Sequence, residues 1–131
     1  MIDHVENIKT ILETQFPEID INYRVRSFTE KNPDKFIIYN IGNQNQQTRA
    51  TDLIIINTEI IINFYVRTDL IITPEITDWS VIFPEINQLE AVMEENNYLS
   101  TGWHDLGDIE NAGFTCINFN FNISEVIVIP S

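Results

Sequence analysis

The residues that could carry chemistry are few and scattered. His104 is followed by Asp105, Asp108 and Glu110, one imidazole and three carboxylates with the right atoms to bind a metal ion. A single imidazole among irregularly spaced acids is not a known ligand spacing, so the pattern argues against a metal site. We therefore expect neither a metal nor a cofactor.

The remaining candidates for acid–base or nucleophilic chemistry have no evident partner. His4 lies beside Asp3 at the start of a predicted helix, where solvent exposure or helix-end electrostatics accounts for it. Cys116 is the only cysteine, which excludes an internal disulfide, and the alternation of its neighbours predicts a half-buried strand position. Phosphate-binding and dinucleotide-binding motifs are absent. The sequence thus predicts a protein that is not an enzyme and acts through its surfaces.

Charge is distributed unevenly along the chain. Its 131 residues include 20 acids and 7 bases, a formal charge of −13 that disfavours binding to the phosphate backbone of nucleic acids. All 7 bases and 9 of the acids lie in the first 67 residues, and the other 11 acids follow Arg67 without any base. One interpretation is ordinary solubility. The other is a protein with one near-neutral surface and one acidic surface, suited to self-association or to a basic partner.

Hydrophobic periodicity predicts the elements that would carry these surfaces. Amphipathic patterns indicate helices over 2–16 and 84–97, and alternating patterns indicate strands. The predicted strands cover 19–26, 36–41, 52–67 and 117–123, with a shorter one at 103–106. We expect a single domain of residues 1–131, an α+β fold with a mainly antiparallel β-sheet and two α-helices packed on one face. No apolar segment is long enough to cross a membrane, so no membrane partner is expected.

Two segments stand out from this plan. Residues 42–51 contain no large apolar side chain, which predicts an exposed loop, either a mobile connection or an arm that becomes ordered on a partner. The strand predicted at 52–67 is longer than usual, so it either bends near 57–59 or projects past the sheet. The segment 68–83 has no clear pattern because Pro74 and Pro84 interrupt its apolar residues.

The order of elements resembles the tail terminator proteins of tailed bacteriophages and the related neck, or head–tail joining, proteins. The resemblance rests on the helix ending at Phe16–Pro17, the strands at 21–28, 36–41 and 54–67, the helix at 84–97 and the final strand at 119–123. It covers almost the whole chain, although the connection 68–83 is longer than this plan suggests.

The resemblance implies a structural protein of the virion, assembled in the host cytoplasm. Such a protein forms a hexameric ring on the head-proximal end of the tail tube, stops tube polymerisation and joins tail to head. Its partners would be further copies of itself, the tail-tube protein and a head-completion or connector protein. DNA would pass nearby without being bound specifically.

Two sets of residues are candidates for these contacts. The interface candidates are four arginines and the asparagines that alternate along the last strand: Arg24, Arg26, Arg49, Arg67, Asn118, Asn120 and Asn122. Amides suit such a contact because they desolvate at lower cost than charged groups if they find partners. The candidates for a DNA-repelling lumen are acids of the second half: Glu85, Glu90, Glu94, Glu95, Asp105, Asp108 and Glu110.

A rival interpretation belongs to another functional class. An acidic inhibitor, either a DNA mimic or an immunity protein, would place its carboxylates in the basic cleft of an enzyme. This explains the charge directly. It explains less well the alternating asparagines and the polar segment 42–51.

Overall fold

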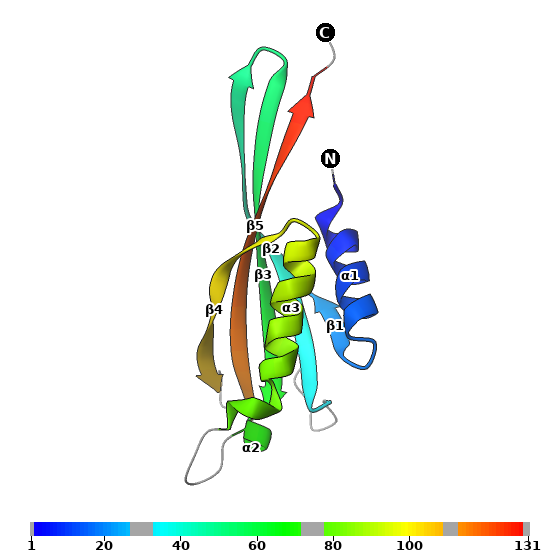
Figure 1. Cartoon of the computed structure of the whole chain (residues 1–131), viewed down its shortest axis with the longest axis vertical. Coiled ribbons are helices and arrows are strands. Elements are labelled where there is room, and N and C mark those ends of the chain that lie inside the picture. Colours follow the sequence, from blue (N-terminus) through cyan, green and yellow to red (C-terminus); the bar gives the residue numbers. More distant parts are fainter. Residues whose placement is uncertain (1, 27–32, 72–77, 109–112, 130–131) are drawn as a thin grey trace.

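A computed structural model describes residues 2–26, 33–71, 78–108 and 113–129 (Figure 1). In these ranges the elements follow in the order α1 (His4–Gln15), β1 (Asp20–Tyr23), β2 (Lys35–Ala50), β3 (Leu53–Arg67), α2 (Thr68–Ile71), the 3₁₀ turn η1 (Trp79–Val81), α3 (Phe83–Glu95), β4 (Leu99–Asp108) and β5 (Phe114–Val128). The chain begins with a helix and ends with a long strand, as the periodicity predicts.

The described strands form one sheet in the order β1-β2-β3-β5-β4. Strand β1 pairs with β2 in parallel, and the other pairs are antiparallel. Helices α1 and α3 lie side by side on one face of this sheet (Figure 1). The predicted α+β class with a mainly antiparallel sheet is confirmed. We call the sheet face that carries the helices the helix face, and the opposite face the open face.

Alternating burial along the two longest strands builds the core. In β3 every second residue from Ile56 to Val66 is buried, and in β5 the same holds from Ile117 to Ile123. Residues of the two strands that share a face also share register, for example Ile62 with Phe119. The helices cover them with Ile8 and Leu12 of α1 and Ile86, Leu89 and Met93 of α3. Their apolar spacing is what the sequence predicts for one buried stripe per helix.

The ends of the helices follow local rules. The Asp3 side chain accepts a hydrogen bond from the Glu6 backbone N–H at 3.3 Å and caps α1. Pro84 lies in the first turn of α3, where its missing N–H costs nothing. Beyond α3, Asn97 adopts φ 69°, the left-handed conformation that often ends a helix.

The prediction of a loop at 42–51 is wrong, because most of this segment is a strand. Strand β2 continues to Ala50 and pairs with β3 down to Leu53, so the segment is the outer half of a long hairpin. The expectation of exposure is confirmed, because the side chains of residues 43–50 are exposed. Pairing uses only backbone groups, and β3 supplies the apolar residues, which is why β2 shows no hydrophobic pattern here.

This hairpin projects beyond the helices together with the end of β5 (Figure 1). We call this projection the arm and define it as residues 44–56 and 124–129. It starts next to a β-bulge between Ile41 and Gln44, where the register of β2 shifts. Bulges increase local twist, which suits the point where the sheet leaves the helical layer. The long strand does not project past the sheet, because β2 and β5 pair with it along its length; the three strands project together past the helices (Figure 1).

Strand β4 is longer than the predicted 103–106 and extends from Leu99 to Asp108. Its pairing with β5 shifts register twice, before Gly102 and before Gly107, and both glycines have positive φ. Two bulges on an edge strand hinder pairing with another sheet. The β4 edge of the sheet is therefore protected against pairing with a further strand, in contrast to the outer edges of the arm.

Candidate assembly surfaces

The arm presents apolar side chains on both faces. Residues that are opposite one another in register share a face, which puts Ile54 and Ile127 on the helix face and Ile55 and Val126 on the open face. None of these four is fully buried, and Val126 is 63% exposed. Val128, on the same face as Val126, is 66% exposed. Contiguous exposed apolar surface of this kind is typical of a surface that binds another protein.

Among the residues that the structure describes, no strand lies beside either long edge of the arm. Strand β1 pairs with β2 only up to Tyr39, and β4 pairs with β5 only between Thr115 and Asn122. Backbone groups of the arm's outer strands therefore face solvent along these edges. Free edges next to apolar residues are where proteins add a strand or pack on a partner.

The arm is held in shape by amide hydrogen bonds at its base. Gln44 donates to the Thr58 hydroxyl at 3.1 Å, and Asn57 donates to Asn45 Oδ1 at 3.1 Å. Ser124 of β5 donates to Asn57 Oδ1 at 2.5 Å. Side chains of all three strands are thus cross-linked where the arm leaves the body. This network favours a preformed arm over one that orders only on its partner.

A buried histidine ties the base of the arm to the helices. His4 is 5% exposed, and its Nε2 lies 2.5 Å from Glu125 Oε1 of β5. Its Nδ1 lies 2.8 Å from the Tyr98 hydroxyl, which also accepts a hydrogen bond from Asn7 at 2.8 Å. From the sequence we expected solvent exposure or helix-end electrostatics to account for His4, without an evident partner. That expectation is wrong.

The sequence contained a signal for this contact. Glu125 occupies a helix-face position in an alternation that is otherwise apolar, between Ile123 and Ile127. An acid at such a position needs a buried polar partner. His4, 121 residues earlier, supplies it.

The surroundings of this cluster shift two pKa values. Burial alone would raise the pKa of Glu125, but hydrogen bonds from the Ile2 N–H and from His4, with the positive charge of His4 and the N-terminus, lower it below the ordinary 4.5. Burial raises the pKa of Tyr98, partly offset by the hydrogen bond from Asn7. In the folded protein Glu125 therefore stays ionised to a lower pH than an ordinary glutamate does.

Replacing Glu125 with glutamine is expected to remove part of the protein's acid sensitivity. Because the folded-state pKa lies below 4.5, the carboxylate's contribution is complete above that pH and is lost as pH falls through the folded value. Near pH 7, Glu125→Gln should lower the free energy of unfolding by about 1.5–3 kcal/mol, the typical contribution of a hydrogen bond to a charged group. The difference should narrow near pH 4.

Urea unfolding at one fixed protein concentration gives the free energy of unfolding of wild type and variant, near pH 7 and near pH 4. Glu94→Gln, an exposed residue of α3, is the matched control, and it should change stability by less than about 0.5 kcal/mol. An unchanged gap between wild type and Glu125→Gln across this pH range would contradict the assignment.

The three candidate asparagines of β5 lie on the open face. Asn118 donates to Asn63 Oδ1 at 2.7 Å, and Asn120 donates to Asn118 Oδ1 at 2.6 Å. Asn122 is exposed beyond them. Asn40, in register with Ile61 and Asn120, has an Oδ1 atom out of solvent without a hydrogen-bond partner in the described ranges. The structure therefore gathers the amides on one face, where Glu59 lies in register with Asn122, and their interface role remains a prediction.

The four candidate arginines do not gather on one surface. Arg26 donates to Asp20 at 2.7 Å, and Arg67 donates to Asp34 at 2.8 Å. Their guanidinium groups lie over the rings of Phe36 and Phe114, which meet edge to face with centroids 5.0 Å apart. These two arginines therefore pack on a small aromatic cluster of their own chain.

Arg24 and Arg49 are placed differently. Arg24 has φ 69° and lies over the Tyr23 ring at 5.1 Å. Arg49 is exposed near the tip of the arm, at a second register shift of β2 between Thr48 and Ala50. Arg49 is thus the candidate whose position best suits contact with another molecule.

The acids proposed for a lumen are divided between two elements. Glu85, Glu90, Glu94 and Glu95 are on α3, whereas Asp105 and Asp108 are on β4, and Glu110 lies outside the described residues. Several serve their own chain: Glu85 pairs with Lys35, Glu90 accepts from Ser100 at 2.9 Å, and Asp108 accepts from Thr68 at 3.1 Å. Glu94 and Glu95 are exposed, and neither faces an intrachain base in the ion pairs of the described ranges.

The remaining chemical candidates give no reactive site. His104 is exposed on β4, and residues 2–26, 33–71, 78–108 and 113–129 contain no group of three or more His, Cys, Asp or Glu able to hold a metal. Cys116 is fully buried rather than half-buried, and burial raises the pKa of its thiol to about 12. A thiol this basic is inert at neutral pH.

Neither the scan against protein-family models nor the search of curated proteins returned a match. Among the described helices, none has the length and apolar character needed to cross a bilayer.

Proposed function

We propose that this protein is a structural component of a phage virion, a tail-terminator-like protein that forms a ring at the head-proximal end of the tail tube. In this function the ring stops tube polymerisation and offers a surface on which the head docks. The proposal joins the order of elements in the sequence with the surfaces described above. Its partners are further copies of the chain, the tail-tube protein and a head-completion or connector protein.

The observation that carries the proposal is the arm. It exposes Val126 and Val128 on one face and is fixed at its base by side-chain hydrogen bonds, and in the described part of the chain no strand pairs with either of its edges. A protein that acts alone has no use for such a projection, which adds exposed apolar surface and invites aggregation. A ring subunit does, because the arm is covered by the next copy.

Charge favours a contact between unlike surfaces of neighbouring copies. The arm carries only Arg49, Asp52 and Glu125, so it is nearly neutral, while the whole chain has a charge of −13. Two acidic bodies repel each other, whereas an arm of low charge can lie against an acidic body. Such an arm-to-body contact is heterologous, and heterologous contacts close into rings when the rotation allows. We assign six copies from the resemblance alone.

The acidic inhibitor gains less support. A DNA mimic requires carboxylates displayed together, but Glu85, Glu90 and Asp108 are engaged with groups of their own chain. An inhibitor also offers no reason for the arm. Binding to a basic enzyme is therefore the alternative outcome of the functional test.

Tube assembly tests the proposed function. The proposed function predicts a tail-tube gene beside the gene of this chain. Its product should polymerise into tubes of uncontrolled length on its own and into capped tubes with this protein present. Electron microscopy should show a ring at one tube end. Tubes of unchanged length without an end ring, at any ratio of the two proteins, would overturn the proposal, and tight binding to a neighbouring nuclease or toxin would favour the inhibitor.

A further inference from the structure

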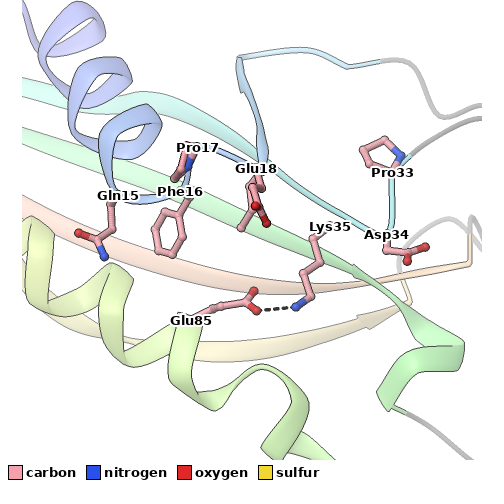
Figure 2. A pocket seen from close by; sticks show the side chains of 9 residues that line it. Gln15, Phe16, Pro17, Glu18, Pro33, Asp34, Lys35 and Glu85 are labelled. Atoms are coloured by element: carbon pink, nitrogen blue, oxygen red, sulfur yellow. Dashed lines mark hydrogen bonds and ion pairs between the residues drawn. The ribbon is translucent and has the colours of Figure 1, made fainter.

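A pocket of about 440 Å³ opens between α1, β2 and α3 (Figure 2). The parts of these elements that line it lie at the end of the body away from the arm (Figure 1). The pocket is formed where the end of α1, the start of β2 and the first turn of α3 meet. Its wall includes the apolar side chains of Phe16, Pro17, Ile19 and Pro33, and its polar groups include Glu18, Asp34, Lys35 and Glu85. The pocket thus combines apolar walls with an excess of carboxylates.

The carboxylates are not fully satisfied by the one base. Lys35 pairs with Oε1 of Glu85, as Figure 2 shows, while Oε2 of Glu85 is out of solvent and lacks a hydrogen-bond partner in the described ranges. Asp34 is already paired with Arg67. Glu18 is exposed at the pocket and has no ion pair with any base that the structure describes. The pocket therefore offers one buried carboxylate oxygen without a donor and one exposed carboxylate without an ion pair, among the described residues.

A long basic side chain fits these features. Its aliphatic stem can lie along Phe16 and Pro17, and its charged end can donate to Glu18 and to Glu85 Oε2. A guanidinium suits this better than an ammonium because it donates to two acceptors in a fixed geometry and is more weakly hydrated.

Arg49 is an arginine of this kind, but it cannot reach the pocket of its own chain. Lys35 at the pocket and Arg49 at the arm tip are opposite ends of the same strand, so 14 residues at about 3.3 Å each separate them by roughly 45 Å. A contact between Arg49 and this pocket must join two copies. Its geometry is head to tail, with the arm of one copy on the body of the next.

We propose that Arg49 of one copy inserts into the pocket between α1, β2 and α3 of the next copy and pairs with Glu18 and Glu85. The proposal rests on the proposed ring and specifies the contact that closes it. The occupant is a second copy because every chain carries both halves of the contact, an exposed arginine on the arm and a pocket with carboxylate oxygens that lack a partner in the described ranges.

Charge reversal with rescue tests the pairing. Arg49→Glu should weaken self-association at least about tenfold, because it leaves the pocket carboxylates facing another acid. Glu18→Arg should weaken it similarly, and the double variant should restore association to within about threefold of wild type. Lys9→Glu, an exposed base on α1 with the same change in charge, is the control and should have little effect. Sedimentation equilibrium gives the association constants.

The outcomes separate this contact from the proposed function. If wild type forms rings and Arg49→Glu leaves them intact, or if the double variant is no better than either single one, the contact is wrong and the ring stands. If wild type does not self-associate, the ring itself fails.

Cross-linking gives a second, independent readout. In the variant Arg49→Cys with Glu18→Cys, a short bismaleimide should join each copy to the next and give a ladder of covalent oligomers on a denaturing gel. Each single variant should stop at dimers, and Cys116 is too buried to react. A double variant that forms intact rings but gives no ladder would contradict the contact.

Discussion

Replacing Val126 and Val128 with glutamate should abolish the proposed ring and leave a folded monomer. Both side chains are exposed on the same face of the arm, at 63% and 66%. If the next copy covers them, each contributes roughly 1.5–3 kcal/mol to association, and the double variant should bind at least about 100-fold more weakly. The free energy of unfolding of the monomer should change little, because the isolated chain leaves both residues in solvent.

Light scattering coupled to size-exclusion chromatography measures the loss of assembly, and circular dichroism checks that the fold is kept. Val81→Glu, an exposed valine in η1 outside the arm, is the control for adding an acid to an already acidic protein. Assembly that survives both arm substitutions would show that the arm has another use.

Replacing Phe119 with alanine should have the largest effect on stability. Phe119 is fully buried on the helix face of β5, between Trp103 at a ring-centroid distance of 6.5 Å and Phe121 at 6.3 Å. Truncating a buried phenylalanine typically costs about 3–5 kcal/mol, from lost burial and the cavity left behind. Since domains of this size are stable by only about 5–15 kcal/mol, the variant should be close to unfolding at physiological temperature.

Urea denaturation at a fixed concentration gives this value directly. Asn122→Ala, three residues along the same strand but exposed on the open face, should shift the midpoint only slightly. A Phe119→Ala midpoint close to that of wild type would mean that the sheet and helices are not packed as described.

The fold was predictable wherever burial imposed a period on the sequence. Alternation from Ile56 to Val66 and from Ile117 to Ile123 identified both long strands and their buried faces, and the apolar stripes identified α1 and α3. The outer half of β2 was not predictable in the same way, because its side chains from Asn43 to Ala50 face solvent on both sides. Backbone pairing leaves no mark on side-chain hydrophobicity.

The candidate surfaces were predictable only in part. The asparagines of β5 do share one face, because strand periodicity fixes the face of each residue. The uneven distribution of charge along the sequence did not predict which charged residues pair in the folded chain. Arg67 pairs with Asp34, and Lys35 of the first half pairs with Glu85 of the second. Likewise the position of Glu125 in an apolar alternation signals a buried polar partner, but the identity of that partner, His4, depends on the return of the last strand to the first helix, which no local pattern encodes.

The mass of the assembled protein tests the central claim, a closed ring built through the arm, most directly. Native mass spectrometry of the full chain should show one dominant species of six copies, about 92 kDa for subunits of 15.3 kDa, and the arm variants should show the subunit alone. A wild-type protein that remains at the mass of one subunit at high concentration, and also in the presence of tail-tube protein, would contradict the claim.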